Sequence, residues 1–244
     1  MRRRLAFPAL VPLLTLAAAV SDQAHHWSYA GEEGPAHWDG TCKTGRAQSP
    51  IDIRTSTAEV EALPPLTFDY RPGPLRIIDN GHTVEVNVDP GSSLTVGNDH
   101  YQLVQFHFHK PSEEAIDGRH YAMVAHFVHR DRMGNLAVVA VLLKAGTDNP
   151  LIDKLWKNVP KEKEHEETLH AVTVSPGQLL PVNRAYFTFT GSLTTPPCSE
   201  RVRWFVLKVP TAIGINQVIG FGKLYRANAR PVQPVNGRQV LASK

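Results

Sequence analysis

The sequence lacks the features of a membrane protein, a repeat protein or a nucleic-acid-binding protein. Beyond residue 20, no apolar run reaches the ~20 residues that a bilayer-spanning helix needs. There is no internal repeat, no low-complexity linker and no break in composition that would separate two domains. Residues 1–24 hold three of the 26 basic and one of the 23 acidic side chains, so the remaining chain carries 23 basic and 22 acidic ones. This balance argues against a nucleic acid or another polyanion as a partner.

Cysteine is scarce, because Cys42 and Cys198 are the only two in 244 residues. In an exported protein, two cysteines favour a single disulfide. Chain-entropy estimates for so long a loop give ~4–5 kcal/mol, although measured values are often smaller. A free thiol and a thiolate metal ligand are the alternatives that the sequence leaves open.

The one long apolar run lies at the start of the chain and is typical of a secretory signal peptide. Three arginines at positions 2–4 precede an apolar stretch from Leu5 to Val20, and Ala17-Ala18-Ala19 supplies small residues for cleavage. An uncleaved anchor helix fits less well, because the run is short and contains two prolines. We expect a signal peptide over residues 1–24, cleaved between 19 and 24, and a periplasmic or secreted protein with no membrane contact after its removal. Residues 25–244 are expected to form one domain.

Helical segments are few, and short β-rich runs between turn signals dominate the chain. Residues 136–143 are apolar almost throughout, which is typical of a strand buried on both faces. Other expected strands cover residues 75–78, 83–88, 93–96, 101–109, 121–129, 185–190 and 202–209, and expected helices cover 151–156, 161–170 and 211–225. The fold class predicted is mainly β (α+β), with a large, mostly antiparallel twisted sheet and a few short peripheral helices.

Three histidines on two of these strands have the spacing of a zinc site. Successive strand residues point to opposite faces, so Leu103, Gln105, His107 and His109 should share one face, with the two histidines ~7 Å apart along the strand. An antiparallel return over residues 121–129 would bring His126 beside them, since neighbouring strands lie ~4.8 Å apart. Three imidazoles leave a fourth zinc position for water. Because the chain has 12 histidines, an accidental grouping is the competing interpretation.

A second segment, residues 191–198, indicates a catalytic role only when it is considered together with the histidines. Residues 191–198 read Gly-Ser-Leu-Thr-Thr-Pro-Pro-Cys, and the paired prolines fix a rigid loop. A hydroxyl on such a loop is a well-placed hydrogen-bonding group, although the composition alone favours an ordinary turn.

Together, these segments resemble the α-class carbonic anhydrases, and among them the exported bacterial type. The resemblance begins at His-His-Trp-Ser-Tyr (25–29) and Gly-Pro-Ala-His-Trp (34–38), and continues through Gln-Ser-Pro-Ile-Asp-Ile (48–53) and Asn-Gly-His (80–82). It goes on through residues 105–109, 125–129, 191–198 and 230–238, in the order of the family and over nearly the whole chain after the leader. It implies a fold with the zinc site at the base of a conical cavity. The implied activity is carbonate dehydratase activity, a lyase reaction that reversibly hydrates carbon dioxide to bicarbonate and a proton.

The resemblance also implies roles for individual residues. His107, His109 and His126 would hold Zn²⁺, which supplies a zinc-hydroxide nucleophile. Thr194 would accept a hydrogen bond from that hydroxide, pass one to the carboxylate of Glu113, and help to hold the substrate oxygen. Glu114 is the adjacent competitor for the role of Glu113.

Further residues would hold the substrate, move the proton and order the site. His82 would shuttle protons, because its ordinary pKa of ~6.5 suits exchange with buffer. Gln105 would accept the free ring N–H of His107, and Tyr29 and Asn80 would order a water chain. Carbon dioxide would lie against Val128, Val138, Leu193, Thr194, Thr195, Val202 and Trp204. Without the resemblance, the apolar ones are ordinary core residues and His82 is an ordinary turn histidine.

The sequence departs from the family at one position beside the metal. The family typically has a glutamate two residues before the third histidine, where this chain has Val124, which cannot accept the N–H of His126. We expect water or another group to take its place and zinc retention to be somewhat weaker, since losing such a partner typically costs ~10–100-fold in affinity or activity. Glu85 occupies a position that varies among relatives, so inhibitor preference does not carry over.

Two other functions compete with this one. A catalytically weak binding protein of the same family would lack zinc histidines, whereas all three are present here. A cupin-like metal protein would use Glu113 as a ligand after the His-x-His pair, but no second cupin motif follows. The resemblance implies weak esterase activity as a side reaction, and a homodimer by analogy with bacterial relatives.

Overall fold

The computed structural model describes residues 26–244. The predicted signal peptide therefore lies outside the described residues. No helix in the described part of the chain is both long and apolar enough to cross a membrane.

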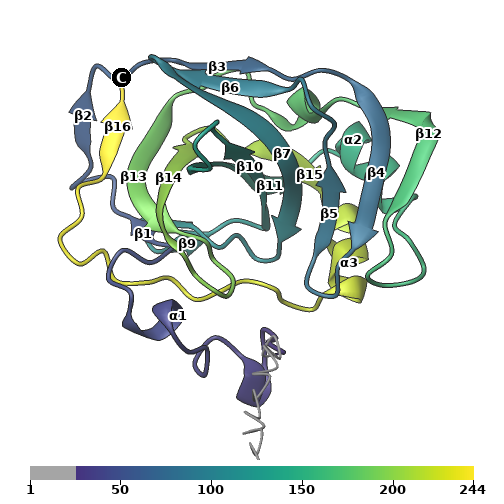
Figure 1. The fold of residues 1–244 in the computed structure, drawn as a ribbon, viewed down its shortest axis with the longest axis horizontal. Helices are drawn as coiled ribbons and strands as arrows, with labels where there is room; N and C mark the ends of the chain where they lie inside the picture. The colour runs from purple at the N-terminus through teal and green to yellow at the C-terminus, as the bar shows by residue number, and fades with distance from the viewer. Residues whose placement is uncertain (1–25) are drawn as a thin grey trace, which may run out of the picture.

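One large sheet of 13 strands organises the described residues (Figure 1). Its long path runs in the order β12 (Glu167–Val174), β4 (Gly73–Asp79), β5 (Val84–Asn87), β7 (Asp99–His109), β10 (Met123–Arg130), β11 (Leu136–Gly146), β14 (Glu200–Leu207), β13 (Tyr186–Ser192), β16 (Leu241–Ser243) and β2 (Glu59–Glu61). Off this path, β3 (Leu66–Asp69) pairs with β6 (Ser93–Val96), β6 also pairs with β7, and β15 (Thr211–Gly214) pairs with β11. Most neighbours are antiparallel, whereas β11 runs parallel to β14 and β15, and β16 runs parallel to β2. The predicted mainly β fold class is confirmed.

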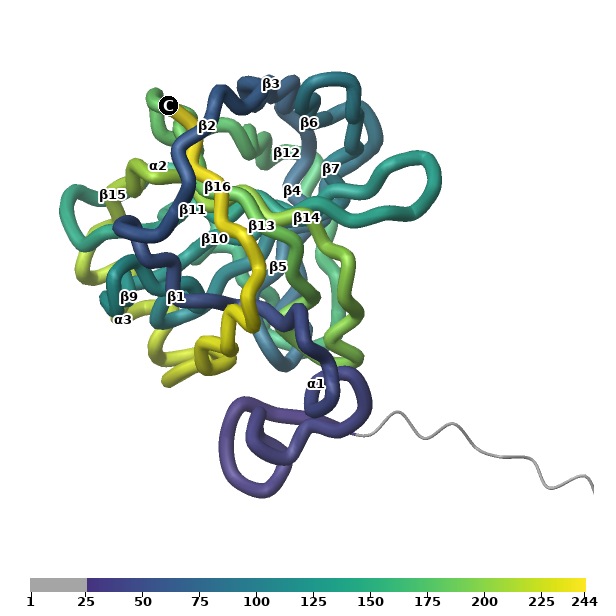
Figure 2. Tube along the Cα trace, turned by 90° about the vertical axis from the view of Figure 1, so that its left-hand side faces the viewer, coloured from purple at the N-terminus to yellow at the C-terminus, as the bar shows by residue number. Residues whose placement is uncertain are grey.

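Smaller elements lie around the sheet. A second sheet joins β1 (Asp52–Ile53), β8 (Ala115–Ile116) and β9 (Arg119–His120). The helices are α1 (Thr41–Thr44), α2 (Pro150–Trp156) and α3 (Ile215–Leu224), with 3-10 turns at Gly31–Glu33 and Pro176–Leu179. Figure 2 shows the N-terminal segment and α1 projecting below the sheet, and β16 running beside β2.

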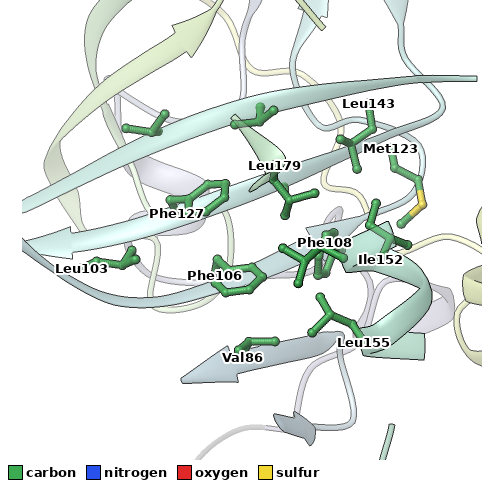
Figure 3. Packing of buried hydrophobic residues seen from close by; sticks show 14 of the residues in the cluster. Val86, Leu103, Phe106, Phe108, Met123, Phe127, Leu143, Ile152, Leu155 and Leu179 are labelled. Atoms are coloured by element: carbon green, nitrogen blue, oxygen red, sulfur yellow. The ribbon is translucent and has the colours of Figure 1, made fainter. Parts of the chain in front are cut away.

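The central strand β11 explains why the sheet has two apolar faces. Its buried residues alternate between two clusters, with Val139 and Val141 in one and Val138 and Ala140 in the other. The prediction of a strand buried on both faces is therefore confirmed. In the first cluster, Phe106, Phe108 and Phe127 pack with Ile152 and Leu155 of α2, as Figure 3 shows. The second cluster lies on the face that carries the histidines.

The predictions for the helices need two corrections. Residues 161–170 do not form a helix, because β12 begins at Glu167 and pairs with β4 at the edge of the sheet. Its exposed polar side chains are typical of an edge strand, and they resemble those of a solvated helix in the sequence. Residues 211–225 divide into β15 and then α3, where Gln217 accepts the backbone N–H of Gly214 and so helps to begin the helix. The predicted helix at 151–156 is confirmed, and Asn149 caps it.

Strand β7 also contains a break in alternation that the sequence did not predict. Val128 of β10 pairs with Gln105, but the next residue, His129, pairs with Leu103, which leaves Val104 as the extra residue of a β-bulge. Leu103 consequently lies in the same cluster as Phe106 and Phe108. The prediction that Leu103 shares the face of the histidines is wrong, and the bulge is the reason.

Candidate metal centre and catalytic site

Strand register brings the three histidines together. His107 and His126 are direct partners on the antiparallel strands β7 and β10, and His109 follows two residues later on the same face as His107. The ring centroids lie 4.9 Å apart for His107 and His109, 4.7 Å for His109 and His126, and 5.5 Å for His107 and His126. One nitrogen from each ring lies within 4.8 Å of the others.

Hydrogen bonds determine which nitrogen of each ring faces the centre. Nδ1 of His107 lies 2.8 Å from Gln105 Oε1, and Nδ1 of His109 lies 2.7 Å from the backbone oxygen of Asn228. In His126 the arrangement is reversed, because Nε2 lies 2.9 Å from Glu114 Oε1. The nitrogens left for a metal are therefore Nε2 of His107, Nε2 of His109 and Nδ1 of His126.

Burial keeps two of these rings neutral. It lowers the pKa of His107 to about 3, and it lowers the pKa of His109 well below its ordinary value, with the charge of His126 acting in the same direction. For His126, burial also favours the neutral form, but the carboxylates of Glu114 and Glu113 outweigh it and raise the pKa. Neutral imidazoles are the form that binds a metal.

Two adjacent buried acids, Glu113 and Glu114, follow β7 and contact different partners. Glu113 Oε1 accepts the backbone N–H of Arg230 at 2.7 Å. Its Oε2 lies 3.5 Å from His109 Nε2 and 3.8 Å from His126 Nδ1, and has no hydrogen-bond partner among the described residues. Burial raises the pKa of Glu113 to about 7, and Glu114 adds to the effect, whereas His126, the Thr194 hydroxyl and the Arg230 amide oppose it.

Glu114 supplies the carboxylate at His126 Nε2, where the family typically uses an acid at position 124. Both of its carboxylate oxygens approach His126 Nε2, at 2.9 and 3.2 Å. Val124 pairs with His109 across the strands and lies fully buried in the second apolar cluster. The group expected to stand in for the missing strand glutamate is therefore a neighbouring loop carboxylate.

The hydrogen bond between His107 and Gln105 continues to two more side chains, Glu85 and Asn80. Gln105 donates from Nε2 to Glu85 Oε2 at 3.1 Å, and Asn80 Nδ2 approaches the same oxygen at 3.4 Å. Burial raises the pKa of Glu85, and the charge of Glu166 adds to that shift. Gln105 lies where it was predicted, while the link to Glu85 was not anticipated.

His82 lies on a turn that is built by Asn80. The Asn80 side-chain oxygen accepts the backbone N–H groups of His82 and Thr83, at 3.0 and 2.9 Å. The His82 ring stacks on Trp27, with centroids 3.7 Å apart and planes 9° apart. Burial lowers the pKa of His82 below its ordinary 6.5, and His26 contributes in the same direction.

Tyr29 lies between the N-terminal aromatic residues and the histidines. Its ring centroid is 6.0 Å from that of Trp38 and 6.4 Å from that of His109, both in edge-on arrangements. Burial raises the pKa of its hydroxyl well above the ordinary value, and the charge of Glu113 adds to this, so the phenol stays protonated. The structure thus brings Tyr29 close to the metal centre, as the resemblance implied.

The loop that carries Thr194 is held at both ends. Ser49 and Ser192 exchange hydrogen bonds, with Ser49 N donating to Ser192 Oγ at 2.9 Å and Ser192 N donating to Ser49 Oγ at 3.1 Å. Gly191 permits this approach, because a Cβ there would collide with Ser49 Oγ and the ring of Trp204. Thr194 itself is buried.

At the other end of the loop, Cys198 forms a disulfide with Cys42, which confirms the predicted pairing. The backbone N–H of Cys198 donates to the carbonyl of Thr195 at 2.8 Å. The disulfide packs with Trp38 and the partly buried Trp27 and Tyr29. It therefore ties the Thr194 loop to the aromatic group that includes Trp27, which stacks on His82.

An apolar wall adjoins His126. Of the apolar residues assigned to the substrate wall, the second cluster contains Val138, Val202 and Trp204, and the partly buried Val128 and Leu193 pack against it. The Trp204 ring is edge-on to His126, with centroids 5.0 Å apart. Thr195 lies in the adjacent loop and is partly buried. The conical cavity stays a prediction.

The donor set fits zinc. His109 Nε2 is fully buried and has no hydrogen-bond partner among the described residues, as expected for a nitrogen that binds a metal. Three imidazole nitrogens suit Zn²⁺, and three protein ligands are typical of its catalytic sites. The metal-compatible group contains the three histidines and no carboxylate, which argues against the cupin-like alternative.

Sequence reasoning missed several residues that support the site. Asn228 accepts from His109 through its backbone oxygen and donates from its side chain to the carbonyls of His82 and Phe108. Arg230 is buried and donates from its guanidinium to the carbonyls of Ser49 and Cys42. Of these, only Arg230 could have been noticed in the sequence, because it begins the segment 230–238 that resembles the family.

Known proteins are similar to this chain over most of its length. A family model described as eukaryotic-type carbonic anhydrase matches residues 33–244. A carbonic anhydrase from Pectobacterium carotovorum is 39% identical over 240 residues, covering 96% of this chain and 97% of its own. One from Klebsiella pneumoniae is 42% identical over 228 residues, covering 89% and 91%. The solved structure of an α-carbonic anhydrase from Thermovibrio ammonificans, in complex with the inhibitor sulfanilamide, has a TM-score of 0.85 and 41% identity, covering 90% of this chain and 99% of that one.

Proposed function

Because this chain belongs to the eukaryotic-type, or α, carbonic anhydrase family, we propose that it reversibly hydrates carbon dioxide to bicarbonate and a proton at a zinc ion. The observation that carries the proposal is the set of three free imidazole nitrogens, each within 4.8 Å of the others. They lie beside an apolar wall and a buried carboxylate. A metal centre beside an apolar surface suits a reaction in which a metal-activated water attacks an uncharged substrate.

His107, His109 and His126 would hold the zinc. When bound, zinc lowers the pKa of a coordinated water to about 7 and so supplies a nucleophile at neutral pH. The low pKa values of His107 and His109 keep their rings deprotonated and ready to bind. Gln105 and Asn228 would fix the orientation of these two rings through the hydrogen bonds at Nδ1.

Thr194 and Glu113 would orient the reaction. The buried Thr194 hydroxyl accepts a hydrogen bond from the attacking oxygen and directs its own proton to Glu113, which aligns an oxygen lone pair with the substrate carbon. Glu113 must accept this hydrogen bond as a carboxylate for the alignment to hold. Its free Oε2 and the Arg230 N–H on its other oxygen suit that role. The Thr194 backbone N–H would help to hold a substrate oxygen.

The apolar wall would hold carbon dioxide without hydrogen bonds. Val138 and Trp204 are direct partners on β11 and β14, and Val128 lies opposite Val138 on β10. All three share the cluster that adjoins His126. A wall of this kind favours an uncharged substrate over bicarbonate and so assists release of the product.

His82 would carry the released proton to the buffer, with Tyr29 and Asn80 ordering water between it and the histidines. Its ring is only partly buried, so it can exchange protons with solvent. Because the pKa of His82 lies below its ordinary value, it releases a captured proton readily at neutral pH. Weak hydrolysis of activated esters would use the same nucleophile and the same cavity.

Stopped-flow carbon dioxide hydration on zinc-quantified protein tests this proposal. We expect about one zinc per chain, with activity and zinc both lost in His107→Ala and both retained in His100→Ala, an exposed histidine on the same strand. A wild-type protein that is inactive with zinc fully bound would refute the hydration activity and favour a family member that only binds ligands. A wild-type protein that binds no zinc would refute the metal centre itself.

We also propose that the chain is exported. Residues 1–24 would be removed, and export would supply the oxidising compartment in which the Cys42–Cys198 disulfide is stable. Mass measurement of the protein recovered from a periplasmic fraction would locate the cleavage. An intact N-terminus would contradict the prediction.

A further inference from the structure

Glu114 is a buried ionisable group near the metal centre to which the mechanism above assigns no role. Its side chain is completely buried, and its carboxylate contacts His126 with both oxygens. A buried carboxylate is costly unless it is paired and hydrogen-bonded. Among the described residues, His126 is the basic group within salt-bridge distance of it. The placement of Glu114 is therefore explained by its contact with His126.

Strand β10 cannot supply this acceptor itself. Residues two positions apart on a strand share a face, so the neighbours of His126 along β10 on that face are Val124 and Val128, both apolar. Val124 is apolar and packs in the second cluster with Val138 and Trp204. An acceptor for His126 Nε2 must therefore come from another element, and the loop between β7 and β8 provides it.

Hydrogen bonds fix the position of that loop. Ser112 Oγ donates to the carbonyl of Glu114 at 2.7 Å and accepts the backbone N–H of Tyr121 at 2.8 Å. Ser112 N donates to the Tyr121 carbonyl, and Ala115 N donates to the carbonyl of Ile51. These bonds fix the loop on both sides of Glu114 and hold its carboxylate against the His126 ring.

We propose that Glu114 is the positioning residue of the third zinc ligand, replacing a carboxylate that strand position 124 does not carry. It accepts the Nε2–H of His126, which fixes the tautomer with Nδ1 free toward the other two histidines. The adjacent acids then have separate duties, with Glu113 directed to Thr194 and Arg230 and Glu114 directed to His126. This inference rests on the proposed zinc function and deepens it.

The proposal changes the expectation for zinc retention. Because the loop supplies the carboxylate, the presence of valine at position 124 should not weaken the site. Val124→Glu alone should leave zinc retention unimproved, since His126 already has its partner and a second acid would be buried without one. This reverses the result expected from the sequence alone.

Zinc dissociation into a chelator, measured on the full chain, tests the proposal without relying on activity. Glu114→Gln keeps the shape of the side chain and removes its charge, and we expect zinc to dissociate ~10–100-fold faster. Adding Val124→Glu to that variant should recover much of the loss, because residue 124 lies on the same face as His126. The matched control, Glu114→Gln with Val124→Gln, should recover none of it.

Two results would overturn the proposal. One is a folded Glu114→Gln protein that retains zinc within about twofold of wild type. The other is an equal loss in both double variants. If wild type binds zinc and hydrates carbon dioxide while Glu114→Gln retains zinc fully, only the role of Glu114 fails. If wild type binds no zinc, the proposed function fails.

A measurement on wild type covers the case in which Glu114→Gln does not fold. In ¹⁵N-histidine-labelled, zinc-loaded protein, we expect His126 to carry its proton on Nε2, with a downfield N–H signal typical of a bond to a carboxylate. An Nε2–H signal without this downfield shift would refute the role of Glu114. Zinc at Nδ1 would by itself leave the proton on Nε2, so the shift of the signal, rather than the tautomer, reports the bond to Glu114.

Discussion

Replacing His129 tests how strongly burial controls ionisation next to the site. His129 lies one residue beyond Val128, at the register shift between β10 and β7, and is completely buried. Its Nε2 lies 2.6 Å from the Tyr70 hydroxyl, and its Nδ1 lies 3.3 Å from the Ala137 carbonyl. A neutral ring satisfies both contacts, with Nε2 accepting from Tyr70 and Nδ1–H donating to Ala137.

The magnitude follows from the shift in pKa. Burial lowers the pKa of His129 from 6.5 to about 4 in the folded protein, while the unfolded chain retains the ordinary value. The unfolded chain therefore binds a proton below pH 6.5 that the folded chain does not. This contribution to stability is fully present above about pH 6.5 and is lost as the pH falls through about 4. The drop of roughly 2.5 pKa units corresponds to about 3 kcal/mol, at 1.36 kcal/mol per unit.

The variant His129→Leu removes the titration. At pH 7 it should be less stable than wild type, because Tyr70 and Ala137 lose their partner at about 1–3 kcal/mol per unsatisfied group. Between pH 7 and pH 4 the difference in the free energy of unfolding should narrow by about 3 kcal/mol. Only wild type has a ring that stays neutral in the fold and becomes protonated on unfolding. Urea unfolding followed by tryptophan fluorescence, with chelator present in both samples, measures the gap at each pH.

The control is His100→Leu, because His100 is exposed in the fold. It should follow the pH profile of wild type. Parallel profiles for wild type and His129→Leu, or a gap that widens toward acid, would refute the assignment of a neutral buried His129.

Three further predictions concern the parts of the molecule around the metal centre. Replacing both Cys42 and Cys198 by serine should lower the free energy of unfolding by up to about 5 kcal/mol, because the bridge spans a sequence separation of 156; a loss below about 1 kcal/mol in urea unfolding would contradict this. His82→Ala should slow hydration at low buffer concentration by up to roughly 10²-fold and should be rescued by added imidazole, whereas unchanged turnover would exclude His82 as the shuttle. Trp27→Ala should raise the pKa of His82 toward its ordinary value, because stacking on Trp27 contributes to the burial that lowers it; an NMR titration showing a lower pKa would count against that cause.

The grouping of the three histidines was predictable because it follows the simplest periodicity in the fold. Alternation places His107 and His109 on one face, and an antiparallel neighbour can bring His126 beside them only in a narrow range of registers. The all-apolar segment 136–143 likewise predicted a central strand. These features depend on residues close together in the sequence, or on a strand pair joined by a short connection.

The hydrogen-bond partners of these histidines were harder to predict, because they come from distant or unremarkable positions. His109 is oriented by the backbone oxygen of Asn228, and a backbone acceptor leaves no mark in the sequence. Glu114 was visible only as one of two adjacent acids, and strand alternation does not extend into the loop that carries it. The bulge at Val104 was also invisible, since nothing in an apolar residue marks it as the extra one.

Arg230 shows why the site depends on nearly the whole described chain. Its backbone N–H fixes Glu113, while its guanidinium donates to the Cys42 and Ser49 carbonyls and to Gln48 Oε1. Ser49 in turn is bonded to Ser192 at the start of the Thr194 loop. A buried guanidinium is costly unless its donors are hydrogen-bonded, and here Nη1 and Nη2 have partners while Nε has none among the described residues. Arg230 therefore depends on the N-terminal segment, which Ser49 links to the Thr194 loop. The hydrogen bond that Arg230 donates to Glu113 is therefore in place only when residues 42–49, 192–198 and 230 have converged, and a change in any of these segments should alter the proposed catalysis through Glu113 without replacing a proposed zinc ligand.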